Sequence, residues 1–136
     1  MTSRFTPELL LLTLFTALAS QGCGEHKLTS VSLSPTAADA KDFARGQVQF
    51  TATGTFSDSS KPVALNNVVW CIGSSSGMCN GNVPAAATVD GNGLAQCVLN
   101  STGTVTVLAG SPGASPMVPD QGQQLQVFGM ARLTCP

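Results

Sequence analysis

The sequence carries little charge. Only 10% of its 136 residues are charged, and the formal net charge is −1. Proteins that bind nucleic acids gather lysine and arginine into a basic surface that neutralises phosphates. A charge this small and balanced produces no long-range field toward nucleic acid or an anionic membrane surface. We therefore expect no nucleic-acid partner.

Residues typical of active sites are also scarce. The chain has one histidine, His26, and no tyrosine. Because His26 lies near the N-terminal leader, we interpret it as a solvated linker residue, and no Ser-His-Asp or Cys-His arrangement can be assembled around it. The stretch Asp90-Gly91-Asn92-Gly93 lacks the spaced acidic ligands and terminal glutamate of a calcium loop and is interpreted as a tight turn. We expect a non-enzymatic protein without catalytic residues, metal or cofactor.

Long apolar runs are missing too. Residues 9–18 form an apolar run of about ten residues, whereas a membrane-spanning helix needs roughly 20. With Arg4 before it, this run fits the helical core of a signal peptide. Two exits stay open. Residues 17–19 (Ala-Leu-Ala) fit an ordinary cleavage site, and residues 20–23 (Ser-Gln-Gly-Cys) resemble a bacterial lipobox, in which Cys23 is lipidated and becomes the first mature residue.

The cysteine count favours lipidation. Five cysteines are an odd number for an exported chain, and removing Cys23 to lipid leaves an even set. Zinc sites favour cysteine pairs with two to four residues between them, whereas seven residues lie between Cys71 and Cys79. Disulfides in an oxidising compartment are therefore expected. Three connectivities are open to four cysteines. The pairing that we favour is Cys71–Cys79 with Cys97–Cys135.

Alternation of apolar and polar residues is what the chain has in abundance. Residues 47–56 alternate throughout, which predicts a strand with one dry and one wet face. The only tryptophan, Trp70, lies mid-run among β-branched residues, and we assign it to the core rather than to sugar stacking. We expect Phe43 to tuck onto the core, residues 57–62 to form a turn and Gly129 a bulge. The predicted core residues are Trp70, Val48, Phe50, Phe56, Val105 and Val107.

About seven short strands separated by turn residues, with no helical block after the leader, predict an all-β fold. We expect an Ig-like sandwich of two antiparallel sheets after an N-terminal helical signal segment. The domain plan is a signal peptide over residues 1–22, a tether over 23–27 and the sandwich over 28–136. The expected strands cover residues 28–35, 47–56, 67–73, 86–89, 94–99, 103–109 and 124–135.

Residues 28–127 resemble the bacterial Ig-like domains, group 2 in particular. The resemblance rests on the pieces Val31-Ser32-Leu33-Ser34-Pro35, Gly46-Gln47-Val48-Gln49-Phe50-Thr51-Ala52, Val69-Trp70, Ala87-Thr88-Val89-Asp90, Asn92-Gly93-Leu94 and Gly103-Thr104-Val105-Thr106-Val107. It implies a surface module, stalk or adhesion domain and brings no catalytic residues with it. The four body cysteines and the proline-rich segment depart from the group's pattern.

The expected function is that of an envelope-anchored module with a structural or adhesive role at the bacterial cell surface. Its membrane partner would be reached through the lipid on Cys23, and the alternative is a soluble secreted or periplasmic protein. A second hypothesis is a module that binds a protein or glycan through the proline-rich loop 111–123. Phe128 and Met130, if exposed beside that loop, are the expected contact residues.

Overall fold

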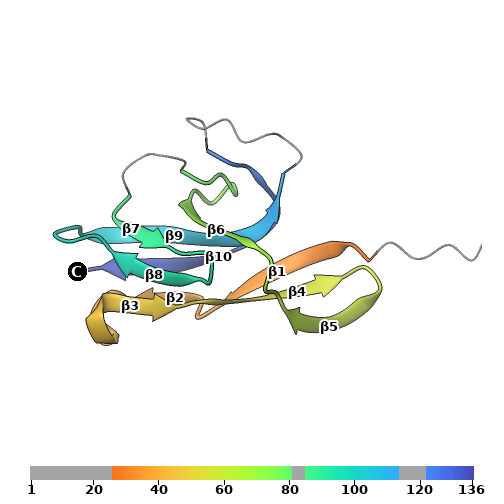
Figure 1. Ribbon diagram of the computed structural model, residues 1–136, viewed down its shortest axis with the longest axis horizontal. Helices are drawn as coiled ribbons and strands as arrows, with labels where there is room; N and C mark the ends of the chain where they lie inside the picture. Colours follow the sequence, from red (N-terminus) through yellow and green to blue (C-terminus); the bar gives the residue numbers. More distant parts are fainter. Residues whose placement is uncertain (1–25, 81–84, 114–121) are drawn as a thin grey trace, which may run out of the picture.

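The computed structural model describes residues 26–80, 85–113 and 122–136, and within them strands are the main secondary structure, with two short 3-10 helices (Figure 1). The expected signal segment, the lipidation at Cys23 and the centre of the proline-rich loop lie outside the described residues. The elements are β1 (Leu28–Ser34), β2 (Ala37–Asp39), η1 (Ala40–Asp42), η2 (Ala44–Gly46), β3 (Gln47–Gln49), β4 (Thr51–Phe56), β5 (Ser59–Ala64), β6 (Val69–Gly73), β7 (Ala87–Val89), β8 (Leu94–Cys97), β9 (Gly103–Pro112) and β10 (Leu125–Cys135).

The strands form a two-layer sandwich. One layer is the sheet β2-β10-β9-β6, and the other combines β1-β4-β5 with β3-β8-β7. The two halves of the second layer are joined because β3 and β4 follow each other along residues 47–56. The pairings are antiparallel except β2 with β10, which is parallel. The order β1-β4/β3-β8-β7 facing β10-β9-β6 is that of an immunoglobulin-type sandwich, with β5 added beside β4 and β2 beside β10.

The alternating stretch 47–56 is a strand as predicted, but it is interrupted at Phe50. Before Phe50 the strand pairs with β8, and after it with β1 and β5. The backbone N–H of Phe50 donates to the carbonyl of Gly93 at 2.9 Å, so no hydrogen bond is lost at the change of partner. One strand thereby holds both halves of this layer together.

The main core lies between the two layers and confirms part of the predicted core. Val48, Phe50 and Val107 are fully buried. Trp70 and Val105 pack against this core but are only partly buried, so the indole is not the central core residue that the sequence predicted. Phe56 does not pack against the core, because β4 extends beyond its edge; its ring stacks on the imidazole of His26 at 4.0 Å between centroids.

A second, smaller core covers the outer face of the four-stranded sheet. Its buried members are Cys79, Leu108 and Leu125, with Phe128 partly buried against them. The alternation of β6 explains the two cores: Trp70 and Ile72 face the main core, and Val69 and Cys71 the smaller one. Because β9 is covered on both faces, residues 107–110 are buried without alternation.

Three local predictions were wrong. Phe43 is 41% exposed, because η1 and η2 carry it outside the core edge. Residues 59–62, expected to lie in the turn 57–62, instead belong to β5 (Ser59–Ala64), an exposed edge strand paired with β4. The register shift in β10 lies between Leu125 and Phe128 rather than at Gly129. Gly129 instead allows close packing, since a Cβ there would lie 2.7 Å from the carbonyl oxygen of Val31.

Candidate functional site

Both predicted disulfides are present. Cys71 of β6 is bonded to Cys79 in the following loop, with 5.6 Å between Cα atoms. Cys97 at the end of β8 is bonded to Cys135 at the end of β10, with 5.7 Å between Cα atoms. The second bond joins the two layers, since β8 and β10 belong to different sheets. The two bonds indicate an oxidising, extracytoplasmic environment.

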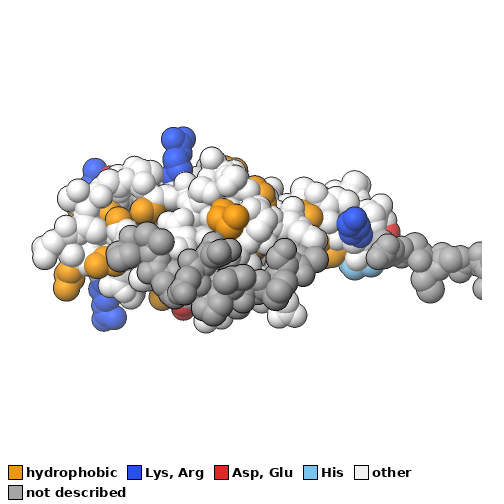
Figure 2. All heavy atoms as spheres, turned by 90° about the horizontal axis from the view of Figure 1, so that it is seen from above, with side chains coloured by type: hydrophobic (Ala, Val, Ile, Leu, Met, Phe, Trp, Pro, Cys, Tyr) orange, Lys and Arg blue, Asp and Glu red, His pale blue; other side chains and the backbone are white. Residues whose placement is uncertain are grey.

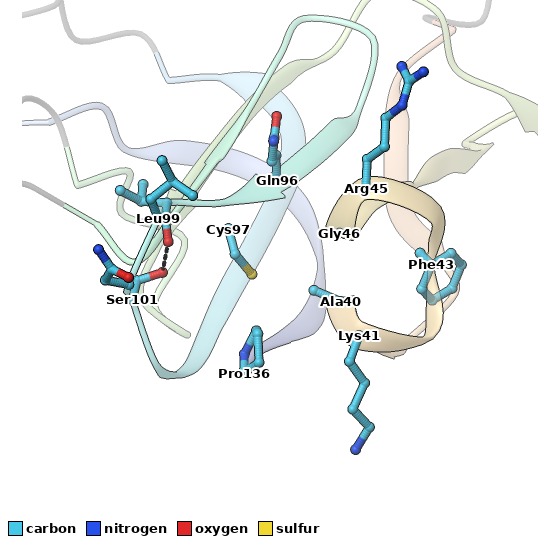
Figure 3. A pocket seen from close by; sticks show the side chains of 12 residues that line it. Ala40, Lys41, Phe43, Arg45, Gly46, Gln96, Cys97, Leu99, Ser101 and Pro136 are labelled. Carbon is cyan, nitrogen blue, oxygen red and sulfur yellow. Dashed lines mark hydrogen bonds between the residues drawn. The ribbon is translucent and has the colours of Figure 1, made fainter.

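Beside the Cys97–Cys135 bond lies a cavity of about 510 Å³, which we call the terminal groove. One wall is the segment 40–46 around η1 and η2, and the other is the segment 96–101, which covers the end of β8 and the residues that follow it. In Figure 3 the side chains of Ala40 and Cys97 point from the two walls into the space between them, and Pro136 lies beside that space. The groove therefore lies at the end of the sandwich where the C terminus is found (Figure 1).

The terminal groove gathers exposed apolar side chains. Phe43 is 41%, Val98 46% and Leu99 91% exposed, and all three line it. They form half of the six large hydrophobic residues found exposed in the described part of the chain. Scattered exposed apolar residues are ordinary, but a cluster around one cavity marks a candidate contact surface.

The backbone on both walls of the groove is unusual. Arg45 has φ = 61° and Asn100 has φ = 62°, and these are the only non-glycine residues with positive φ in the described ranges. The left-handed conformation costs non-glycine residues free energy, and such strain often clusters at functional sites. Ser101 supports one wall, because its Oγ–H donates to the carbonyl oxygen of Ala86 at 2.6 Å.

The groove has no charge of one sign at its centre. The Lys41 and Arg45 side chains are directed away from it (Figure 3). Lys41 pairs with Asp39 at 2.9 Å. Its ammonium lowers the pKa of Asp39, chiefly through this hydrogen bond, and the carboxylate raises the pKa of Lys41 in return. On the face drawn in Figure 2 the Lys and Arg side chains lie apart from one another and form no basic patch. The terminal groove thus offers an apolar surface rather than an anion site.

The predicted contact residues behave differently from each other. Phe128 packs over Gly77, where an added Cβ would clash with its ring, and covers the smaller core. It is therefore a packing residue rather than a contact residue. Met130 is 47% exposed, as a contact residue should be. Residues 114–121 of the loop expected beside them lie outside the described ranges.

A second cavity, of about 390 Å³, lies beside Trp70. It is found where the strand 47–56 changes partner from β8 to β5, and Asn66 and the turn at Gly91 and Asn92 form part of its wall. The turn has the predicted form: the Asp90 carboxylate accepts backbone N–H bonds from Asn92 (2.8 Å) and Leu94 (2.9 Å). These bonds, that from Leu94 first, lower the pKa of Asp90.

His26 is solvent-exposed, as predicted, but it is docked on the folded body instead of being free in a linker, which corrects that part of the interpretation. Its Nδ1–H donates to the carboxylate of Asp58 at 2.8 Å, and its ring stacks on Phe56. The hydrogen bond from His26 lowers the pKa of Asp58. Lys27 is also held, because its carbonyl oxygen accepts from Ser57 N–H at 2.8 Å. The last two residues of the predicted tether therefore belong to the folded body.

Nothing in the described part forms a recognisable reactive centre. No group of three or more His, Cys, Asp or Glu residues there is placed to hold a metal ion. No helix in the described ranges has the length and apolar character needed to cross a membrane.

Sequence reasoning found the cross-links but missed the terminal groove. Phe43, Val98 and Leu99 come from two distant segments and follow no shared period. The adjacent pair Val98-Leu99, directly before the turn at Asn100, was the one available signal, because neighbouring residues on a strand cannot both face one core. Neither the comparison with protein-family models nor that with curated proteins gave a match.

Proposed function

We propose that this chain is a non-enzymatic, envelope-anchored Ig-like module with a structural or adhesive role at the bacterial cell surface. The proposal takes up the resemblance to the group 2 bacterial Ig-like domains. In it, Cys23 carries the lipid that holds the protein to the membrane, and the terminal groove is the surface that contacts another protein.

The observation that carries this proposal is the arrangement of the two ends. The first described residues enter β1 at one end of the long axis, and the C terminus lies at the other, beside the terminal groove (Figure 1). A module held at its N-terminal end would present Phe43, Val98 and Leu99 on the end farthest from the membrane. That is the end at which an adhesive contact could be made.

The cross-links suit a module that bears load between its ends. Cys97–Cys135 ties the last strand to the opposite layer, and β10 pairs with both β2 and β9. Pulling the C terminus away would require breaking a covalent bond as well as two ladders of hydrogen bonds. This supports a structural or adhesive role over one that needs large opening motions.

The anchor is tested by cell fractionation of two variants. Cys23→Ala removes the proposed lipid site, and Ala19→Leu blocks the alternative ordinary cleavage. If Cys23 is lipidated, Cys23→Ala releases the protein from the membrane fraction, and Ala19→Leu leaves it there. Mass spectrometry of the mature N terminus should find a diacylglyceryl cysteine. An unmodified N terminus at Ser20 would instead support the soluble secreted form.

The adhesive role is tested with two matched substitutions. Val98 and Val63 are both 46% exposed, but only Val98 lines the terminal groove. Cells that display Val98→Asp should lose adhesion to each other or to coated surfaces, while Val63→Asp should behave like the wild type. Equal adhesion of all three would leave the structural role alone. Surface display measured with an antibody controls for expression.

A further inference from the structure

The cavity beside Trp70 has walls that are already fixed; we call it the indole groove. On one side, Gln49 donates from Nε2 to the carbonyl oxygens of Asn92 (2.7 Å) and Phe50 (2.9 Å), which braces the turn. On the other, the N–H of Leu65 donates to the carbonyl of Ala52 at 2.9 Å and fixes the segment before Asn66. A binding site with such walls needs little ordering when a ligand enters.

Trp70 lines this groove and carries an unused hydrogen-bond donor. The indole lies next to Gly93, where an added Cβ would come within 2.8 Å of its Cζ2. No hydrogen bond to the indole N–H is found in the described part of the chain, and no buried side-chain nitrogen or oxygen there lacks a partner. The indole N–H is therefore open to solvent. An aromatic residue with an apolar body and a free donor is suited to binding a partly polar ligand.

Polar groups with unused hydrogen-bonding capacity line the same cavity as the indole. The side-chain amide of Asn66 lines the groove and makes no hydrogen bond within the described ranges. Gln49 donates from its Nε2 to both carbonyls, which leaves its Oε1 as an acceptor for a ligand. Together these side chains offer both donors and acceptors, which is what a ligand rich in hydroxyl groups requires.

The groove contains no ionisable side chain. Its lining consists of amide, hydroxyl, aliphatic, glycine and aromatic residues. A charged ligand would lose hydration there without meeting an opposite charge, which is costly. At about 390 Å³ the groove lies within the usual range for small-ligand sites. The chemistry therefore selects a neutral ligand.

We propose that the indole groove binds a neutral oligosaccharide, with Trp70 as the apolar contact and N–H donor and with Asn66 and Gln49 as hydroxyl-binding groups. The inference rests on the proposed function in one respect, since it gives the adhesive module a glycan ligand. It places that ligand away from the proline-rich loop and away from the terminal groove.

The test uses fluorescence of the full exported protein. Trp70 is the only tryptophan and the chain has no tyrosine, so the emission reports on this groove directly. Cellotetraose, maltotetraose and chitotetraose serve as neutral probes, and tetragalacturonate as the charged one. At least one neutral probe should change the emission saturably, and the charged probe should not. Absence of saturation with all three neutral probes up to about 10 mM, a range of weak affinity, overturns the proposal.

Substitution of two neighbouring asparagines distinguishes binding in the groove from binding elsewhere on the surface. Asn66→Ala removes a lining amide, and Asn67→Ala removes an exposed amide that does not line the groove. The dissociation constant should rise about tenfold in Asn66→Ala, the usual effect of one lost hydrogen bond, and stay unchanged in Asn67→Ala. Equal weakening in both, or in neither, contradicts the assignment. If glycan binding fails while Cys23→Ala still releases the protein from membranes, the anchored module stands without this ligand.

Discussion

The two disulfides should differ in what they contribute to stability. We compare the double variant Cys71→Ala/Cys79→Ala with the double variant Cys97→Ala/Cys135→Ala. Each pair joins one buried and one partly buried cysteine, so the packing lost is similar in the two variants. The separation along the chain is not similar: it is 8 residues in the first pair and 38 in the second. The comparison therefore isolates the closed loop.

A disulfide restricts the unfolded chain, and the restriction grows with the logarithm of loop length. For a separation of 8 residues the relation gives about 2.5 kcal/mol at 25 °C, and for 38 residues about 3.9 kcal/mol. The difference is 1.5RT ln(38/8), or about 1.4 kcal/mol. Loss of Cys97–Cys135 should therefore lower the free energy of unfolding more than loss of Cys71–Cys79.

The assay is urea unfolding of the oxidised wild type and of both variants, followed by Trp70 emission and by circular dichroism. Free energies extrapolated to water are the quantity to compare, because removing a cross-link also expands the unfolded state and raises the m-value. Equal losses, or a larger loss for the short loop, would refute the loop-entropy reasoning. If the Cys97→Ala/Cys135→Ala variant loses more stability and its unfolding midpoints differ between Trp70 emission and circular dichroism, the two layers separate before they unfold.

The remaining predictions use thermal or urea unfolding. Gly93→Ala should cost about 1–3 kcal/mol, because Gly93 has φ = 80° and its added Cβ would lie 2.6 Å from the Phe50 carbonyl oxygen; Gly91→Ala, which meets nothing within 4 Å, should be nearly neutral. Phe128→Ala should cost about 2–4 kcal/mol as a packing residue, and Met130→Ala less than about 0.5 kcal/mol. Asp90→Asn should lower the free energy of unfolding at neutral pH. As the pH falls, this variant should lose less stability than the wild type does.

The sign of the acid effect follows from the lowered pKa of Asp90. The pKa of Asp90 in the folded protein lies below its ordinary value of 3.8. Just below pH 3.8 the carboxylate is therefore still charged in the folded protein, whereas it takes up a proton in the unfolded chain. Its stabilising contribution is thus present above that value and is lost as the pH falls through the folded pKa. Stability curves of wild type and Asp90→Asn should converge below pH 3.8; parallel curves would contradict this.

For the two glycine variants, equal losses of stability in Gly93→Ala and Gly91→Ala would show that the contact with Phe50 is unimportant.

The strands with a buried face were predictable, and those without one were not. Alternation located β1, β3, β4 and β9, and the order of strands predicted the sandwich. β5 (Ser59–Ala64) escaped because all its residues are exposed, and because Lys61 and Pro62 are typical of turns and protected edges alike. Its pairing with β4 exists only in the folded protein, and no local pattern records it.

Long-range geometry explains the other differences. Alternation along residues 47–56 predicted that Phe56 faces inward, but the core does not reach as far along β4 as Phe56. Its ring stacks on His26 instead. Strict alternation along β10 would place Phe128 on the face opposite Leu125, but the register shift between them turns both toward the smaller core. The cysteine pairing was favoured among three because strand ends near one pole can meet. No comparable rule predicts the terminal groove, because its two walls come from segments that are far apart in the sequence.

The docking of His26 and Lys27 against the turn after β4 fixes how far the body can stand from an anchor. Only Gly24 and Glu25 separate Cys23 from His26, and even fully extended they span about 10 Å. An acyl chain on Cys23 would thus keep the β4–β5 hairpin beside the lipid headgroups and restrict how far the sandwich can lean. The distance between the opposite end and the bilayer would then be set by the length of the folded sandwich and not by a flexible linker.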